Sequence, residues 1–137
     1  QEKSLYTDTP IVHQYLKEMN QASFGQDPNS ITVGEMSSTT IANSIKYSNP
    51  NEHELSMVFN FHHLKVDYQN GEKWTKAPFD FMKLKQLFTQ WQEEMDQGAG
   101  WNALFWNNHD QPWHFLDLAI PVSTAKNRLR CWQRQFI

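Results

Sequence analysis

The stretch Ile31-Thr32-Val33-Gly34-Glu35-Met36 decides the fold. Its β-branched residues favour a buried, pleated strand over residues 31–34, and Gly34 permits a tight turn or the close approach of another group. Glu35 then stands where this strand meets its loop. In parallel α/β folds, that edge carries ligand-binding and catalytic residues. A lone glutamate at a strand end is more often a solvated loop residue, and the rest of the chain must decide between the two interpretations.

Length and composition indicate one globular unit. The 137 residues, 39% hydrophobic and 14% aromatic, are enough for one modest core. The formal net charge is −3 with acidic and basic residues interspersed, which argues against nucleic acid as a partner. No apolar run approaches the roughly 20 residues of a membrane-spanning helix, and no signal peptide is recognised. The single cysteine, Cys131, permits no internal disulfide. We therefore expect a cytoplasmic protein.

Helices and strands alternate along the chain. Capping residues and apolar spacing predict helices that begin at Thr9-Pro10, after a cap within residues 37–40 and at Asp80. Strands are expected at 31–34, 55–61 and 103–106, so the pattern is typical of βαβ units in a parallel sheet. Polar residues at the three strand ends would then share one edge, as on the active face of a (β/α)8 barrel. The predicted core faces of the first and last helices are Ile11, Val12, Tyr15, Leu16 and Met19, and Phe81, Leu84, Leu87, Phe88, Trp91 and Met95.

Two carboxylates, Glu35 and Asp110, are predicted at that edge. Neighbouring carboxylates shift each other's pKa, so that one stays protonated while the other stays ionised. This suits glycoside hydrolysis, in which an acid protonates the leaving oxygen while negative charge supports an oxocarbenium-like transition state. His109 would donate a hydrogen bond to a sugar hydroxyl or serve as a structural loop residue.

The loop after the second predicted strand offers two other kinds of site. His62 and His63 are adjacent on an extended segment and would point in opposite directions, with no third ligand at a supporting spacing. We therefore predict no metal site and no cofactor. Lys65 and Lys73 flank an Asn-Gly turn, and a hairpin-like loop would bring both ammonium groups toward one phosphate. The other interpretation is two solvated lysines.

Several motifs together resemble the α-amylase superfamily, glycoside hydrolase family 13. They are TVGEM at 32–36, FNF at 59–61 and WNNHDQP at 106–112, and the resemblance covers about residues 9–112. Within the family, the motifs are similar to the branch of oligo-1,6-glucosidases and trehalose-6-phosphate hydrolases. Residues 54–74 resemble the latter, because the oligo-1,6-glucosidases typically carry an acidic residue near Lys65.

The resemblance implies a fragment of a (β/α)8 barrel, about strands 5 to 7 with their helices, and a retaining α-glycosidase. Glu35 matches the general acid/base, Asp110 the transition-state-stabilising carboxylate and His109 its sugar-binding neighbour. Lys65 and Lys73 become candidates for binding a substrate phosphate. The implied substrate is a phosphorylated disaccharide, trehalose 6-phosphate, which gives glucose and glucose 6-phosphate. An oligo-1,6-glucosidase or related α-glucosidase and a non-catalytic sugar-binding relative remain as alternatives.

The resemblance also implies what this chain lacks. The family's nucleophile is an aspartate after the fourth strand, in a segment expected to precede Gln1. Retaining chemistry needs both carboxylates, so we expect a fragment that is inactive in isolation. An incomplete barrel would expose unpaired strand edges, so we also expect poor solubility or a molten state when the chain is expressed alone.

The family likeness changes after Pro112. Residues 1–112 are interpreted as a partial catalytic barrel domain, and residues 113–137 as a tail that departs from the family. The family would continue with an Arg-Phe-Gly-Asp motif. Restoring one G after the TGG codon of Trp113, with permitted codons thereafter, gives WAFLRFGDSGKYRKESAEMLATAIH, which contains that motif. We interpret the tail as the product of a reading-frame slip.

Overall fold

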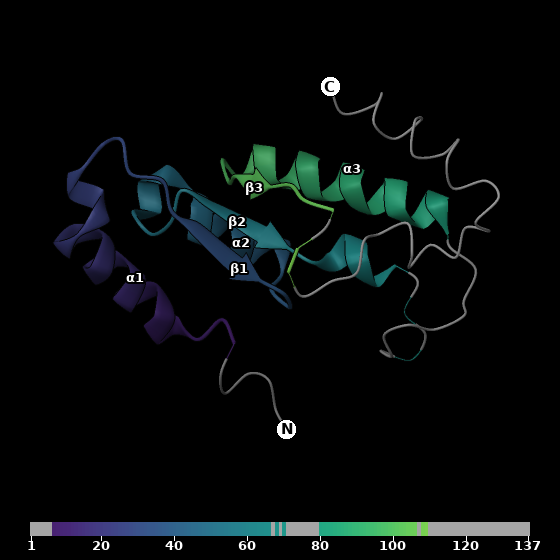
Figure 1. Cartoon of the computed structure of the whole chain (residues 1–137), viewed down its shortest axis with the longest axis horizontal. Helices are drawn as coiled ribbons and strands as arrows, with labels where there is room; N and C mark the ends of the chain where they lie inside the picture. Colours follow the sequence, from purple (N-terminus) through teal and green to yellow (C-terminus); the bar gives the residue numbers. More distant parts are fainter. Residues whose placement is uncertain (1–6, 67, 69, 71–79, 107, 110–137) are drawn as a thin grey trace. The chain divides into compact units, whose positions relative to one another are not determined.

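The structure, a computed structural model, describes residues 7–66, 68, 70, 80–106 and 108–109. The chain divides into two compact units, residues 1–104 and 105–137, and every helix and strand described here lies in the first. In chain order these elements are α1 (Pro10–Ala22), η2 (Phe24–Gln26), β1 (Val33–Met36), α2 (Ile41–Ser48), η3 (Pro50–Glu52), β2 (Met57–Asn60), η4 (His62–Lys65), α3 (Phe81–Gln97) and β3 (Asn102–Ala103), where η marks a 3₁₀ turn (Figure 1).

The strands form a parallel sheet in the order β1-β2-β3. Glu35 lies opposite Phe59, and Val58 lies opposite Asn102. The predicted alternation of helices and strands and the parallel sheet are therefore confirmed over the described residues. Because all three strands run in the same direction, their carboxyl ends share one edge of the sheet.

The predicted bounds of all three strands are wrong, and the second strand is Met57–Asn60 rather than 55–61. β1 begins at Val33 rather than Ile31, because Thr32 and Ser56 bond through their side chains there: Thr32 N–H donates to Ser56 Oγ at 3.1 Å, and Ser56 N–H to Thr32 Oγ1 at 3.0 Å. Glu35 consequently lies inside the strand and not in the loop after it. The third strand is Asn102–Ala103 rather than 103–106.

The predicted starts of the helices are confirmed. Thr40 Oγ1 accepts the Asn43 N–H at 3.2 Å at the start of α2, and Asp80 Oδ1 accepts the Lys83 N–H at 2.9 Å at the start of α3. Both bonds satisfy an N–H group that the first helical turn cannot pair. Thr9 precedes α1, which begins with a proline, but its side chain makes no capping bond.

The core lies between the sheet, α2 and α3. Tyr47, Val58, Trp91 and Met95 form its buried cluster. Gly98 brings α2 close to the end of α3, because a Cβ at this position would lie 2.5 Å from Ile45 Cδ1. The same junction is joined by hydrogen bonds from Asn49 Nδ2 to the Gly98 carbonyl at 3.0 Å and from the Trp101 N–H to Ser48 Oγ at 2.9 Å.

Two predicted helix faces are only partly buried. On α3, Leu84, Trp91 and Met95 are buried as predicted, whereas Phe81 is 57% exposed at the helix start. On α1, Val12 and Leu16 pack against the core. The rest of the predicted α1 face, Ile11, Tyr15 and Met19, is exposed, so that part of the prediction is wrong for this structure. Helical spacing marks an apolar face but cannot show how much of it the described chain covers.

Polar contacts to a buried carboxylate, that of Glu54, also hold α1 in place. Glu54, 2% exposed, has its Oε2 atom 2.9 Å from His13 Nδ1, and its backbone carbonyl accepts a hydrogen bond from Asn20 Nδ2 at 3.1 Å. The His13 ring stacks on Tyr47 at 4.5 Å, and the Tyr47 hydroxyl donates to Asp8 at 3.0 Å. Burial, and then the bond to Asp8, raise the pKa of Tyr47. A buried carboxylate needs partners of this kind.

The short turn η4 packs on α3 through two rings. His62 lies against Trp91 with ring centroids 4.7 Å apart, and His63 stacks on Phe88 at 5.5 Å. Burial, and then the nearby Lys65 ammonium, lower the pKa of His62. Phe88 and Trp91 of the predicted aromatic stripe therefore pack against η4, whereas Phe81 does not lie in the core.

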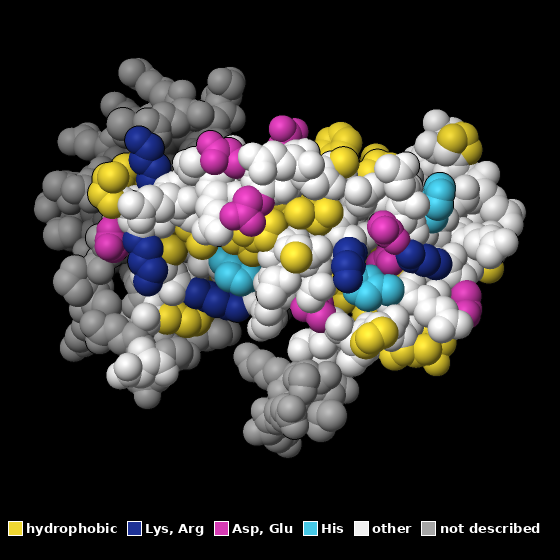
Figure 2. Space-filling view, turned by 180° about the vertical axis from the view of Figure 1, so that it is seen from behind, with side chains coloured by type: hydrophobic (Ala, Val, Ile, Leu, Met, Phe, Trp, Pro, Cys, Tyr) yellow, Lys and Arg dark blue, Asp and Glu magenta, His cyan; other side chains and the backbone are white. Residues whose placement is uncertain are grey.

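The surface carries charges of both signs. Figure 2 shows acidic and basic side chains interspersed over the described part of one face, as the composition indicated. Among the helices that the structure describes, none combines the length and the apolar character that crossing a membrane would require.

Exposed apolar side chains predict how this chain behaves by itself. Ile31 and Trp101 are 73% and 64% exposed, and each would gain about 1.5–3 kcal/mol from burial. We expect the isolated chain to bind the dye ANS and to lose near-UV circular dichroism gradually on heating. The double variant Ile31→Lys/Trp101→Lys, with the same core, should bind less dye. A sharp cooperative melt without dye binding would contradict this prediction.

Candidate active site

Glu35 is the third residue of β1, and its side chain is exposed. Its neighbours Gly34 and Met36 are partly buried on the other side of the strand, since successive side chains alternate. A Cβ at Gly34 would lie 2.6 Å from Leu55 Cδ1, so the glycine allows Leu55 to pack directly against the strand. Leu55 thus packs on one side of β1, and the Glu35 carboxylate lies on the other.

A cavity of about 480 Å³ lies beside β1 and the start of α1. Glu35 lines it together with Asp8, the hydroxyl groups of residues 37–39, and the apolar side chains of Val12 and Leu55. Its volume falls in the range of small-molecule sites, about 300–1,000 Å³. Carboxylates and hydroxyl groups beside an apolar wall are suited to hold a sugar.

Lys65, the last residue of η4, reaches the end of β1. Its ammonium group donates a hydrogen bond to the backbone carbonyl of Ser37, two residues after Glu35. The sheet explains this contact, because Met36 lies opposite Asn60 and the segments that follow β1 and β2 leave the same edge. The structure therefore brings Lys65 to the strand end that carries Glu35.

The other predicted site residues are not placed with these two. His109 is exposed and belongs to the second compact unit, residues 105–137. Asp110 and Lys73 lie outside the described residues. The pairing of Glu35 with Asp110, and that of Lys65 with Lys73, stay predictions.

Adjacent histidines occupy packing positions. Both rings of η4 lie against aromatic side chains of α3, and His63 is buried. Within the part of the chain that the structure describes, no three His, Cys, Asp or Glu side chains are grouped so as to hold a metal ion.

Sequence reasoning gave no individual role to Asn60, the buried last residue of β2. Its Oδ1 atom accepts the His62 N–H at 3.3 Å, and its Nδ2 donates to Asn102 Oδ1 at 3.4 Å. Asn102 Nδ2 in turn donates to the Trp91 carbonyl at 3.4 Å. The signal in the sequence was a polar amide between apolar residues at the end of a buried strand.

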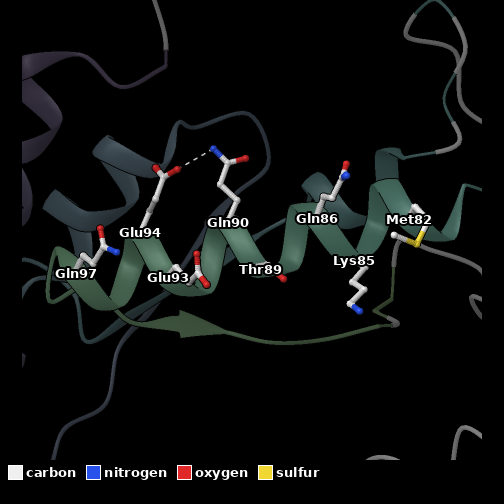
Figure 3. Close-up of a pocket in the computed structure, with 8 residues that line it drawn as sticks. All are labelled: Met82, Lys85, Gln86, Thr89, Gln90, Glu93, Glu94 and Gln97. Carbon is white, nitrogen blue, oxygen red and sulfur yellow. Dashed lines mark hydrogen bonds between the residues drawn. The ribbon is translucent and has the colours of Figure 1, made fainter.

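A second cavity, of about 360 Å³, runs along α3 (Figure 3). The described residues that line it all belong to this one helix, and Gln90 Nε2 donates to Glu94 at 2.8 Å along it. No predicted site residue is among them. The cavity beside β1, which Glu35 lines, is the candidate active site.

Comparison with known proteins adds a family to this geometry. Residues 1–122 match the family model for the alpha amylase catalytic domain. The chain is 61% identical over 110 residues to the trehalose-6-phosphate hydrolase of Bacillus subtilis (strain 168). This match covers 80% of this chain and 19% of that protein. It is 42% identical over 107 residues to the oligo-1,6-glucosidase of Parageobacillus thermoglucosidasius. This second match covers 78% of this chain and 19% of that protein.

The fold agrees with a solved structure of the family. The Bacillus licheniformis trehalose-6-phosphate hydrolase superposes with a TM-score of 0.75 at 63% identity, covering 80% of this chain and 20% of that one. The chain thus spans about a fifth of the length of the relatives that it matches. Since the family model matches most of its residues and the parallel sheet agrees with the solved relative, the chain belongs to the α-amylase family.

Proposed function

We propose that these residues form part of a trehalose-6-phosphate hydrolase, as strands 5 to 7 of its (β/α)8 barrel. The observation that carries this proposal is the Lys65 ammonium held on the Ser37 carbonyl, beside the strand end that bears Glu35. A phosphorylated sugar needs a fixed cation near the acid that cleaves it, and lysine is a common point-charge partner of phosphate. The higher identity to a trehalose-6-phosphate hydrolase than to an oligo-1,6-glucosidase supports the same assignment.

In the proposed reaction, Glu35 protonates the oxygen between the two glucose units, and later deprotonates the attacking water as a base. A nucleophilic aspartate from the rest of the barrel forms the covalent glycosyl-enzyme. Asp110 supports the positive charge of the transition state, and His109 binds a sugar hydroxyl. Lys65 and Lys73 bind the phosphate. A cytoplasmic location stays a prediction of the sequence.

The second candidate is an oligo-1,6-glucosidase, favoured only by the weaker match to that enzyme. A chimera distinguishes the two. In this chimera, the matching residues of this chain replace the corresponding segment of the Bacillus subtilis hydrolase. We expect it to hydrolyse trehalose 6-phosphate in preference to isomaltose. Preference for isomaltose would favour the second candidate.

The role of Glu35 predicts a dependence on the leaving group. In the chimera, Glu35→Gln should slow hydrolysis of trehalose 6-phosphate by about 10²–10⁴-fold, because a sugar alkoxide needs a proton to leave. A nitrophenyl α-glucoside, whose leaving group needs little protonation, should lose less in its first step, measured as the nitrophenol burst. Glu18→Gln, an exposed glutamate on α1, is the matched control and should change neither rate. Equal losses on both substrates would contradict the acid role.

The roles of Lys65 and Lys73 predict a loss confined to the phosphorylated substrate. Lys65→Ala/Lys73→Ala in the chimera should lower kcat/KM for trehalose 6-phosphate by about tenfold or more, since a hydrogen bond to a charged group contributes about 1.5–3 kcal/mol. An unphosphorylated aryl α-glucoside should be hydrolysed almost as before. Lys85→Ala, an exposed lysine of α3, serves as the charge-matched control. Equal losses on both substrates would overturn the phosphate role.

We also infer that the tail after Pro112 results from a reading-frame slip; residues 110–137 lie outside the described part of the chain. Support comes from the Arg-Phe-Gly-Asp motif that one restored base creates. The test is to sequence the gene. When one base is restored after the codon for Trp113, we expect the resulting reading frame to encode the motif and to continue without a stop codon. A gene in which this frame encodes no such motif would refute the slip.

A further inference from the structure

We propose that Asn60 is a positioning residue for phosphate recognition: its side-chain amide fixes the turn η4 that presents Lys65. This inference rests on the proposed function, because it assumes that Lys65 binds the substrate phosphate. It adds a residue that touches neither the reacting atoms nor the phosphate. Asn60 ends β2, and η4 begins two residues later, at His62.

Asn60 joins the sheet to the start of η4. The residue is 7% exposed, and both ends of its amide are used: Oδ1 accepts the His62 N–H at 3.3 Å, and Nδ2 donates to Asn102 Oδ1 at 3.4 Å. The position therefore requires one acceptor and one donor on a short side chain. Aspartate keeps the acceptor, loses the donor and adds a charge opposite the Asn102 oxygen.

A second amide fixes the direction of the first. Asn102 Nδ2 donates to the Trp91 carbonyl at 3.4 Å, so its Oδ1 atom faces Asn60. The indole of Trp91 lies against the His62 ring at 4.7 Å. The first residue of η4 is consequently held twice, at its backbone N–H by Asn60 and at its ring by α3.

This hold is transmitted to Lys65. Side chains three residues apart eclipse in a 3₁₀ turn, so Lys65 stands on the same side of η4 as His62. The Lys65 ammonium bonds the Ser37 carbonyl at the end of β1. The far end of the turn is bonded as well, since Lys83 Nζ of α3 donates to the Val66 carbonyl at 3.4 Å. Loss of the Asn60 amide leaves the first residue of the turn held only through its ring, so that its backbone can shift while the far end stays fixed.

The test measures substrate selectivity in the chimera. Asn60→Ala and Asn60→Asp should raise the KM for trehalose 6-phosphate about tenfold, as expected when a charged hydrogen bond is misplaced. The kcat for this substrate and the kcat/KM for an unphosphorylated aryl α-glucoside should stay within about twofold. A general loss of structure would instead affect both substrates. Asn102→Ala, which removes only the second amide, should give a smaller rise in the same KM, and it keeps the proposal testable if the Asn60 variants do not fold.

A double-mutant cycle identifies the residue through which Asn60 acts. In a Lys65→Ala background, Asn60→Ala should cost less than about twofold further in kcat/KM for the phosphorylated substrate, because residues that act through one contact are not additive. Ser48→Ala is the matched control: it removes a buried hydroxyl of α2 that bonds the Ser44 carbonyl and the Trp101 N–H, outside the hydrogen bonds of the Asn60 and Asn102 side chains. We expect it to lower the melting temperature and leave the KM ratio of the two substrates unchanged.

The outcomes separate this inference from the proposed function. If Lys65→Ala is selective for the phosphorylated substrate and the Asn60 and Asn102 variants are not, the inference is overturned and the proposed function stands. Additive losses from Asn60→Ala and Lys65→Ala also overturn it. If Lys65→Ala lowers kcat/KM equally for both substrates, the phosphate role and this inference fail together.

Discussion

Backbone hydrogen bonds between β1 and β2 run in the parallel sense, and the other features of the described structure depend on this pairing. Parallel neighbours cannot be joined by a hairpin, so the chain must return along the sheet through α2. The returning helix covers one face and forms the core with Tyr47 and Val58. The same pairing leaves the segments after β1 and β2 at one edge, where Lys65 meets the carbonyl of Ser37.

Close packing around β1 and at the end of α3 requires glycine at two positions. Gly34 admits Leu55 to the face of β1, and Gly98 admits Ile45 to the end of α3. Both glycines are needed for space, since neither has a positive φ in this structure. A side chain at Gly34 would force the Leu55 and Met36 side chains to move, and one at Gly98 would force the Ile45 side chain to move.

Local signals in the sequence predicted much of this architecture, because caps and apolar spacing act over only a few residues. Thr40 and Asp80 start helices where expected, and the alternation of elements predicted a parallel sheet. The errors arise from partners distant in sequence. The Thr32 N–H donates to the Ser56 side chain and the Ser56 N–H to the Thr32 side chain, although the Thr32 carbonyl still accepts the Met57 N–H, and β1 begins one residue later. No local pattern marks Glu54 as a buried carboxylate, because its partner His13 lies 41 residues earlier.

The candidate acid and the candidate phosphate-binding cation depend on different kinds of support. Glu35 is held by the backbone hydrogen bonds between β1 and β2. These bonds are kept with any side chain that fits the strand. Lys65 is held on a turn whose first residue is bonded by the Asn60 amide and packs through its ring against Trp91. A change at Asn60 can therefore move the cation while the acid keeps its place. Under the proposed function, we therefore expect substitutions at this edge of the sheet to alter the preference for a phosphorylated substrate more easily than cleavage itself.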